Sequence, residues 1–354
     1  MAHTEMDTSR PADRRHCHLV SVVIEWDNAR VSKLVRARNM YRVLVGQIRR
    51  LHDDWDSYAK GGSRTEQTIT RVIEVFVLYD ALEIEPAVIE AVTSAPGSAL
   101  PDGVALHVVG TPGLGYYDLK NEGAKHARGD IVVFLDSDVI PEPDWLDEIL
   151  RPFRDPAIQV VAGNSYIEPV SLYSRAFALT WFFPLRTPVG PLATTSCFFA
   201  NNFAGRREVL RQYPFPDQPR FRGQCTTLAK TLVKDGVSIC ANPNAHIAHP
   251  APNGVSHFFR RAIWEGHDVI VDHCLRGALA PVGTGESIRL SYSGLRTKAS
   301  QLWRTVQSQR GQVGLSAVAA PLAFAIALVY YTTCAVGEIL SRRDPHIIRR
   351  HFPI

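Results

Sequence analysis

The stretch IVVFLDSDVIPEPDWL, residues 131–146, is the best guide to the architecture of this chain. An apolar run rich in β-branched residues ends in two aspartates one residue apart, Asp136 and Asp138, and a turn with two prolines follows. The run predicts a buried strand with two carboxylates at its carboxyl end. The spacing alone says little, because Asp54 and Asp56 repeat it without a strand before them.

Further strands with helical segments between them are expected upstream. Since strands that alternate with helices form βαβ units, the pattern predicts an α/β fold with a mostly parallel sheet covered on both faces. Ligands bind such sheets outside the carboxyl ends of the strands, where Trp26, Asp27 and Asp80 also fall. The expected strands are 18–26, 71–80, the run VALHVVG and 131–138, and the expected helices are 30–56 and 86–92.

The second half of the chain is less regular. A strand is expected at 158–169, an aromatic amphipathic stretch at 171–185, and a helix from about 224 to a glycine stop at Gly236.

Composition describes an ordinary globular protein. The 354 residues are 45% hydrophobic and 21% charged, with a formal net charge of +4, and no basic patch interleaved with aromatics indicates nucleic-acid binding. Six cysteines lack CxxC spacing, which argues against a structural zinc site or a disulfide scaffold and favours a reducing compartment. The polar first 18 residues lack the apolar stretch of a signal peptide.

Residues 313–337 form an uncharged apolar run. About 20 apolar residues can span a bilayer as a helix, so this segment is a predicted membrane anchor, with arginines on both sides that leave its topology open. Pro321 could kink the run. A single span, a re-entrant element and a very hydrophobic core helix are the alternatives.

The two carboxylates at 136 and 138 suggest a cation site. At a strand end they can face one oxygen-preferring ion, with a diphosphate and water completing its shell. The alternative is that one aspartate caps the turn and the other is solvated.

Three segments together resemble the family 2 glycosyltransferases of the GT-A fold, over most of residues 18–270. SVVIEWDN resembles the first nucleotide-binding strand, VFVLYDALE the second, and DLKNEGAKHARGDIVVFLDSDVIPEPDWL the helix, strand and Asp-x-Asp motif. The family usually has proline, threonine or serine, and tyrosine where Glu25, Trp26 and Asp27 stand.

The resemblance implies roles for individual residues. It implies that Trp26 and Asp80 contact the nucleotide, and that Lys120, Asn121 and Gly123 lie beside the donor sugar and diphosphate. In the Asp-x-Asp motif, it implies that Asp136 contacts ribose or metal and that Asp138 contacts metal. In NAHIAHP it implies His249 as a metal ligand, with His246 as competitor, and in HFFRRAIWEGHD it implies that Arg260 and Arg261 contact the diphosphate. Lys120 and Asn121 could instead be an ordinary helix start, the histidine structural, and the arginines solvated.

One departure from the family concerns the catalytic base. Inverting members carry Glu-Asp at the start of the helix after a Phe-Asp loop, and here Gln224 and Cys225 align with that pair. Cys225 at a helix N-terminus, Asp217 and Glu168 are the candidate proton acceptors. A retaining reaction and a chain that binds a nucleotide sugar without transferring it are also open.

The sequence therefore predicts a GT-A glycosyltransferase that uses a uridine or guanosine diphosphate sugar with Mg²⁺ or Mn²⁺ and works at the cytoplasmic face of the cell membrane. Its acceptor is unknown, and a lipid-linked acceptor is one candidate. A sugar nucleotidylyltransferase is a rival that usually has a Gly-rich loop after the first strand, and IEWDNARVSK has none. The expected parts are a polar tail (1–17), a catalytic domain (18–279, divided after residue 140 into nucleotide-binding and acceptor halves), a connection (280–312), the anchor (313–340) and a basic tail (341–354).

Overall fold

A computed structural model describes residues 16–30, 32–59, 68–275, 284–344 and 346–352. Most of the expected N-terminal tail and the start of the expected connection lie outside these ranges. The first half contains β1 (His16–Glu25), η1 (Asp27–Arg30), α1 (Leu34–Ala59), β2 (Thr68–Tyr79), α2 (Pro86–Thr93), β3 (Ala105–Gly110), α3 (Tyr116–His126) and β4 (Ile131–Asp136). The middle contains β5 (Ile140–Pro141), α4 (Trp145–Leu150), η2 (Arg151–Arg154), β6 (Val160–Ile167), α5 (Leu172–Thr180), β7 (Ala193–Thr195), β8 (Asn202–Arg206), α6 (Arg207–Gln212), α7 (Gln224–Lys234) and β9 (Ile239–His249). The C-terminal part contains α8 (Gly254–Leu275), α9 (Thr284–Gln309), η3 (Arg310–Val313), α10 (Ala320–Arg343) and α11 (Ile347–His351).

One mixed sheet organises the chain, with the strand order β3-β2-β1-β4-β8-β6-β9-β5 and β7 also paired to β9. The first four strands are parallel, as the sequence predicts. Beyond them the sheet becomes mixed, because β8 runs antiparallel to both β4 and β6. The expected α/β class is confirmed.

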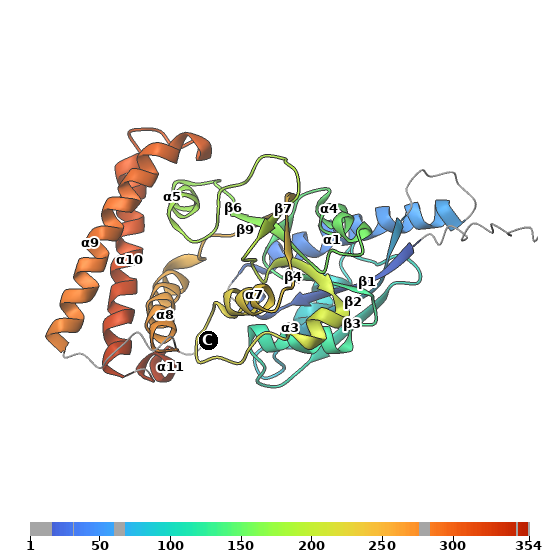
Figure 1. Ribbon diagram of the computed structural model, residues 1–354, viewed down its shortest axis with the longest axis horizontal. Helices are drawn as coiled ribbons and strands as arrows, with labels where there is room; N and C mark the ends of the chain where they lie inside the picture. The colour runs from blue at the N-terminus through green and yellow to red at the C-terminus, as the bar shows by residue number, and fades with distance from the viewer. Residues whose placement is uncertain (1–15, 31, 60–67, 276–283, 345, 353–354) are drawn as a thin grey trace, which may run out of the picture.

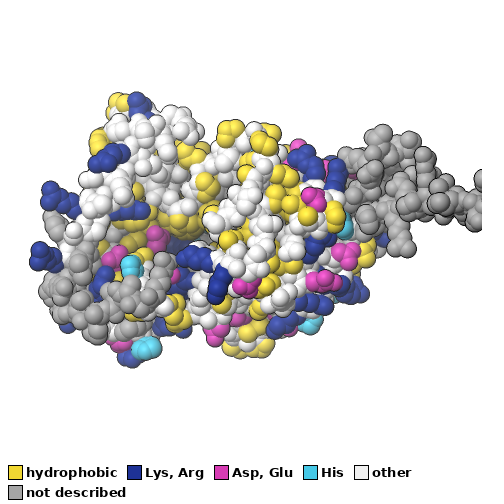
Figure 2. Space-filling view, viewed as in Figure 1, with side chains coloured by type: hydrophobic (Ala, Val, Ile, Leu, Met, Phe, Trp, Pro, Cys, Tyr) yellow, Lys and Arg dark blue, Asp and Glu magenta, His cyan; other side chains and the backbone are white. Residues whose placement is uncertain are grey.

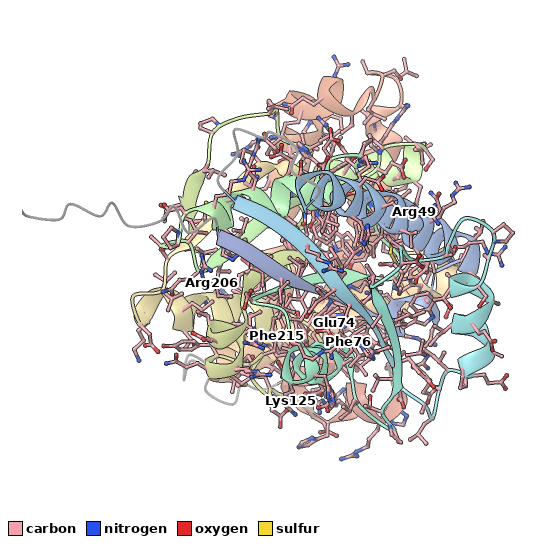
Figure 3. The ribbon with its side chains drawn as sticks, turned by 90° about the vertical axis from the view of Figure 1, so that its right-hand side faces the viewer. Arg49, Glu74, Phe76, Lys125, Arg206 and Phe215 are labelled. Carbon is pink, nitrogen blue, oxygen red and sulfur yellow. The ribbon has the colours of Figure 1, made fainter. Side chains whose placement is uncertain are left out.

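Helices cover both faces of the parallel half. Side chains alternate along β2, so Val75 packs with Leu44 of α1 on one face and Phe76 packs with Leu119 of α3 on the other. Figure 3 shows this arrangement, with Arg49 marking α1 on one side of the sheet and Lys125 marking α3 on the other.

Strand register sets the edge where the site lies. Glu25, the last residue of β1, pairs with Asp136, the last residue of β4. The two acidic strand ends therefore lie side by side at the carboxyl edge of the sheet.

The C-terminal helices α8, α9 and α10 form a separate layer beside the sheet (Figure 1). The backbones of α8 and α10 are in contact, because a β-carbon at Gly266 would overlap the Cys334 carbonyl and one at Gly337 would overlap the Ile263 carbonyl. Tyr330 of α10 packs in the same hydrophobic cluster as Phe177 of α5. One side of α10 is therefore an integral part of the fold.

The helix α10 differs in extent from the predicted anchor. It begins at Ala320, after a turn in which Gly314 has a φ of 64°. Pro321 lies in the first turn, where its missing N–H has no helical partner to lose, so it starts the helix instead of kinking it. Of the described helices, α10 alone is long and apolar enough to cross a membrane, with 24 residues and a mean hydropathy of 1.6 over an 18-residue window.

Candidate active site

A cavity of about 630 Å³ opens at the carboxyl ends of β1 and β4 and is closed on the opposite side by α8 and residues 181–183. Figure 2 shows charged side chains of both signs in the hollow between the sheet and the C-terminal helices. A volume of this size suits a small-molecule ligand.

The carboxylate of Asp136 is fully engaged by the protein. The Lys120 Nζ lies 2.6 Å from its Oδ1, the Tyr116 hydroxyl donates to it at 2.9 Å, and the Asn28 Nδ2 donates to its Oδ2 at 2.8 Å. Asp136 is 2% exposed and Lys120 is fully buried. Lys120 does not line the cavity itself, so its place is beneath Asp136, where it neutralises the carboxylate.

Asp138 is differently placed. Its side chain lines the cavity, is 4% exposed, and its Oδ1 has no hydrogen-bond partner. Burial, and then the neighbouring charge of Asp136, raise the pKa of Asp138 to about 7. A buried carboxylate oxygen without a partner at a cavity wall fits an oxygen-preferring divalent cation.

His249 can add a nitrogen ligand to the same wall. Its Nδ1 donates to the Pro250 carbonyl at 2.6 Å, which leaves Nε2 with a free lone pair. Burial lowers the pKa of His249 to about 4, so the ring is neutral and able to bind a metal. Among the residues that the structure describes, no three His, Cys, Asp or Glu side chains gather closely enough to hold an ion by themselves. A cation here needs further ligands from a bound molecule.

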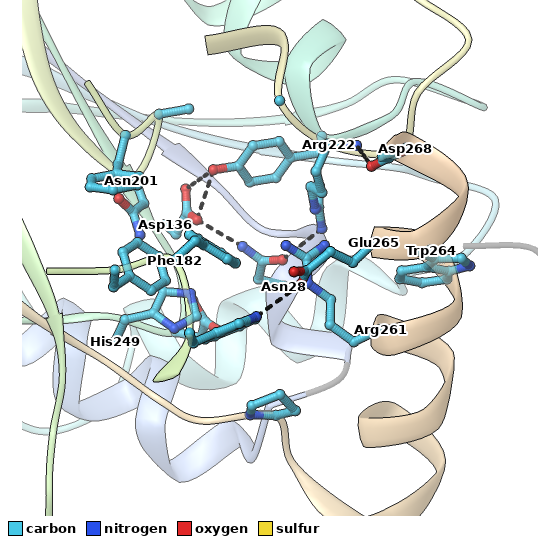
Figure 4. A pocket seen from close by; sticks show the side chains of 18 of the residues that line it. Asn28, Asp136, Phe182, Asn201, Arg222, His249, Arg261, Trp264, Glu265 and Asp268 are labelled. Atoms are coloured by element: carbon cyan, nitrogen blue, oxygen red, sulfur yellow. Dashed lines mark hydrogen bonds between the residues drawn. The ribbon is translucent and has the colours of Figure 1, made fainter. Parts of the chain in front are cut away.

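An aromatic wall faces these groups. The Trp181 Nε1 donates to Glu265 Oε2 at 3.1 Å, and the Tyr330 hydroxyl of α10 donates to the same oxygen at 2.8 Å. The Arg261 guanidinium lies 5.6 Å from the Trp181 ring centre, and Phe182 extends the wall. Figure 4 shows Phe182, Glu265 and Arg261 around the same space as His249 and Asp136.

Besides Lys120, three more residues that the sequence assigned to donor binding are not on the cavity lining. Trp26 is fully buried in the core. Asp80 accepts hydrogen bonds from the backbone N–H groups of Leu82 at 2.9 Å and Gly113 at 2.8 Å, so it orders the loops after β2 and β3. Asn121 exchanges two hydrogen bonds with the Phe215 backbone, at 2.8 and 2.9 Å, and so positions the 213–217 loop.

The candidate proton acceptors differ in their position relative to the cavity. Cys225 lines the cavity, is 8% exposed, and accepts a hydrogen bond from Tyr117 at 3.6 Å. Asp217 is exposed and away from the cavity, near Asp118 of α3, whose pKa burial and then the Asp217 charge raise. Glu168 pairs with Arg36 at 3.5 Å and is not on the lining.

Among the remaining predicted residues, Arg260 and Arg261 both line the cavity. Gln224 is turned away from it, donating to the Arg220 carbonyl at 3.1 Å, and His246 bonds to the Thr187 carbonyl at 2.9 Å. Neither of these two side chains lines the cavity.

The sequence did not indicate three residues that build the site. Asn28 follows the first strand, Tyr116 begins α3, and Arg222 precedes α7; all three line the cavity. The Arg222 Nη2 donates to Asn28 Oδ1 at 3.3 Å, and its guanidinium lies 4.2 Å from the Tyr116 ring centre. Their only sequence signal is a position next to a strand end or a helix start.

Comparisons with known proteins agree with the motif region. The family model described as Glycosyl transferase family 2 matches residues 101–213. A Pre-mycofactocin glycosyltransferase of Mycobacterium tuberculosis is 30% identical over 135 residues, which is 37% of this chain and 29% of that protein. The match thus spans less than a third of the relative's length.

Solved structures give a weaker likeness. The mannosyltransferase PcManGT from Pyrobaculum calidifontis, in complex with GDP-Man and Mn²⁺, aligns with 15% identity and a TM-score of 0.47, covering 91% of this chain and 87% of that one. A crystal structure of a mycobacterial protein aligns with 18% identity and a TM-score of 0.43, covering 75% and 77%.

Proposed function

We propose that this chain is a glycosyl transferase of family 2, whose family model matches residues 101–213. It would transfer a sugar from a nucleotide diphosphate sugar to an acceptor hydroxyl with Mg²⁺ or Mn²⁺. The observation that carries the proposal is Asp138, a buried carboxylate with an unpartnered oxygen at the wall of a cavity of about 630 Å³. A bound cation would remove the cost of burying that charge.

The surrounding residues support the same reaction. Asp138 and the neutral His249 would hold the cation, which neutralises charge on the diphosphate leaving group when bound. Lys120, with no exposure to solvent, holds the Asp136 carboxylate in place through an ion pair of 2.6 Å. Trp181 and Phe182, from the stretch after α5, would form the acceptor side, which favours a flap over the site as the role of this stretch.

The proton acceptor is the open part of this proposal. Of the three candidates from the sequence, only Cys225 lines the cavity. Glu265 is a further carboxylate on the lining, opposite the strand ends. A chain that binds nucleotide sugars without turnover is the alternative favoured by Gln224 and Cys225, which replace the usual acidic pair.

Release of nucleoside diphosphate from a panel of uridine and guanosine diphosphate sugars, with Mn²⁺ present, tests the proposal. Release is expected from the wild type, and Asp138→Asn should abolish it while the exposed Asp217→Asn leaves it unchanged. Tight binding of a sugar nucleotide with no release in the presence of any acceptor would support the silent alternative. Pyrophosphate released from a nucleoside triphosphate and a sugar phosphate would support a nucleotidylyltransferase.

We also propose that the chain is held at the cytoplasmic membrane face by the exposed side of α10. Leu322, Val329 and Val336 recur every seven residues on that side and are 55%, 49% and 45% exposed. The opposite side packs on α8, which lines the cavity and carries charged residues. This packing favours a helix that lies on the bilayer over one that crosses it.

Membrane flotation with vesicles of anionic phospholipid tests this attachment. Val329→Glu should reduce flotation, and Val108→Glu, at a valine of β3 that is 43% exposed, should not. Resistance of the wild-type protein to carbonate extraction from cell membranes would instead favour a spanning helix.

A further inference from the structure

We propose that Arg222 binds the diphosphate of the donor directly, as a fixed cation on the side of the cavity that α7 provides. This inference rests on the proposed function, and it concerns a residue that neither the sequence motifs nor the family comparison assigned.

Among the described residues, the Arg222 guanidinium makes no direct ion pair, although the charges of Asp27 and Glu25 act on it from farther away. Its Nη1 is buried and has no hydrogen-bond partner, and its Nη2 reaches only the neutral Asn28 amide oxygen, at 3.3 Å. Within the described ranges no carboxylate forms an ion pair with it. Buried arginines are normally paired, so an unpartnered guanidinium N–H at a cavity wall indicates a ligand with acceptor oxygens.

The guanidinium is held in place before any ligand arrives. Its flat face lies on the Tyr116 ring, at 4.2 Å from the centre. Asp268 of α8 accepts hydrogen bonds from the backbone N–H groups of Phe221 at 2.7 Å and of Arg222 at 2.8 Å. The next residue, Gly223, has a φ of 96°, which an L side chain rarely adopts. A charge fixed in this way loses little freedom on binding, which strengthens its contact with an anion.

The position of Arg222 relative to the acidic strand end suits a diphosphate. One amide side chain, Asn28, links the two: it accepts from Arg222 and donates to Asp136 at 2.8 Å (Figure 4). A diphosphate next to Asp136 and Asp138 needs positive charge around it, and Arg222 supplies this from the side facing the strand ends. The planar guanidinium can give two parallel N–H donors to phosphate oxygens.

The other cavity arginines are less suited to this role. Arg260 is exposed. Arg261 lies against the aromatic rings of Trp181 and Phe182, at 5.6 and 5.7 Å. Arg30 pairs with Asp27 and Glu83, and Arg220 pairs with Asp272. Arg222, by contrast, lines the cavity with a buried N–H group that has no partner.

Calorimetric titration with UDP, GDP and the matching nucleosides, all with Mn²⁺, tests the inference. Arg222→Gln should weaken binding of the preferred diphosphate about 10-fold to 100-fold, because a hydrogen bond to a charged group is lost. Nucleoside binding should change less than about 3-fold, since the nucleoside has no phosphate. Arg42→Gln, at an exposed arginine of α1, is the matched control and should change neither affinity.

Comparing the diphosphate and nucleoside affinities distinguishes direct binding by Arg222 from a purely structural role. If Arg222 only held Asn28 in place, diphosphate and nucleoside binding would weaken together, and that result would overturn the inference. Arg222→Lys keeps the charge and the aliphatic stem, so it serves if the Gln variant does not fold; it should lose several-fold in diphosphate affinity, and unchanged affinity would also overturn the inference. Wild-type protein that binds neither UDP nor GDP with Mn²⁺ would reject the proposed function itself.

Discussion

Replacement of Lys120 by methionine should destabilise the chain strongly, although the ammonium never meets solvent. The Nζ lies 2.6 Å from Asp136 Oδ1, a separation that corresponds to an attraction of about 6 kcal/mol at an effective dielectric constant of about 20. Tyr116 and Asn28 continue to donate to the carboxylate in the variant, so part of its charge stays compensated. Loss of one partner of a buried pair costs about 3–5 kcal/mol, and we expect a value in that range for Lys120→Met.

Urea denaturation, followed by tryptophan fluorescence, measures the free energy of unfolding. The matched control is Lys125→Met in the same helix, where the lysine is 69% exposed and pairs with Glu122 at 3.0 Å; an exposed pair is worth about 1 kcal/mol or less. Adding Asp136→Asn to Lys120→Met should recover much of the loss, because the uncompensated charge is then gone. Equal, small losses for both lysine variants would refute the reasoning.

Three other outcomes are expected. Gly266→Ala should lower the free energy of unfolding by about 1–3 kcal/mol in the same urea assay, because the added β-carbon meets the backbone of Cys334. Its control is Gly294→Ala in α9, where the added carbon meets open space, and this variant should raise the free energy of unfolding by up to about 1 kcal/mol. Burial lowers the pKa of His257 to about 4, so between pH 6.5 and pH 4 the unfolded ring binds a proton that the folded ring does not. The free energy of unfolding should therefore decrease as the pH is lowered from 6.5 to 4, and it should decrease less in His257→Gln. Asn121→Ala removes two hydrogen bonds to the 213–217 loop and should cost about 1–3 kcal/mol, with faster proteolysis confined to that loop; unchanged cleavage would contradict the positioning role.

The sequence was sufficient for the parallel half of the fold. Alternating apolar runs locate β1 to β4, since a strand buried on both faces leaves a continuous apolar signal. The boundaries of α10 were less accessible, because an apolar run does not show where a turn ends and a helix begins. Gly314 and Pro321 mark that point only when the backbone is known.

The site residues were predictable where a charged side chain follows a recognisable strand. Asp136 and Asp138 follow an evident strand, and both line the cavity. Arg222 lies 84 residues after Asp138 in a loop without periodicity, so nothing local connects it to the cavity. Trp26 shows the opposite case, since a strand end fixes a position along the chain but not the face to which the side chain turns.

The contact between α8 and α10 makes the last helix part of the binding pocket. Gly266 touches α10 from the residue directly after Glu265, which lines the cavity. A shortened chain designed for easier purification by removing α10 would therefore lose the outer support of its own pocket. Among relatives, residues 263 and 266 should change together with residues 334 and 337, because a larger side chain on one helix fits only if the other withdraws.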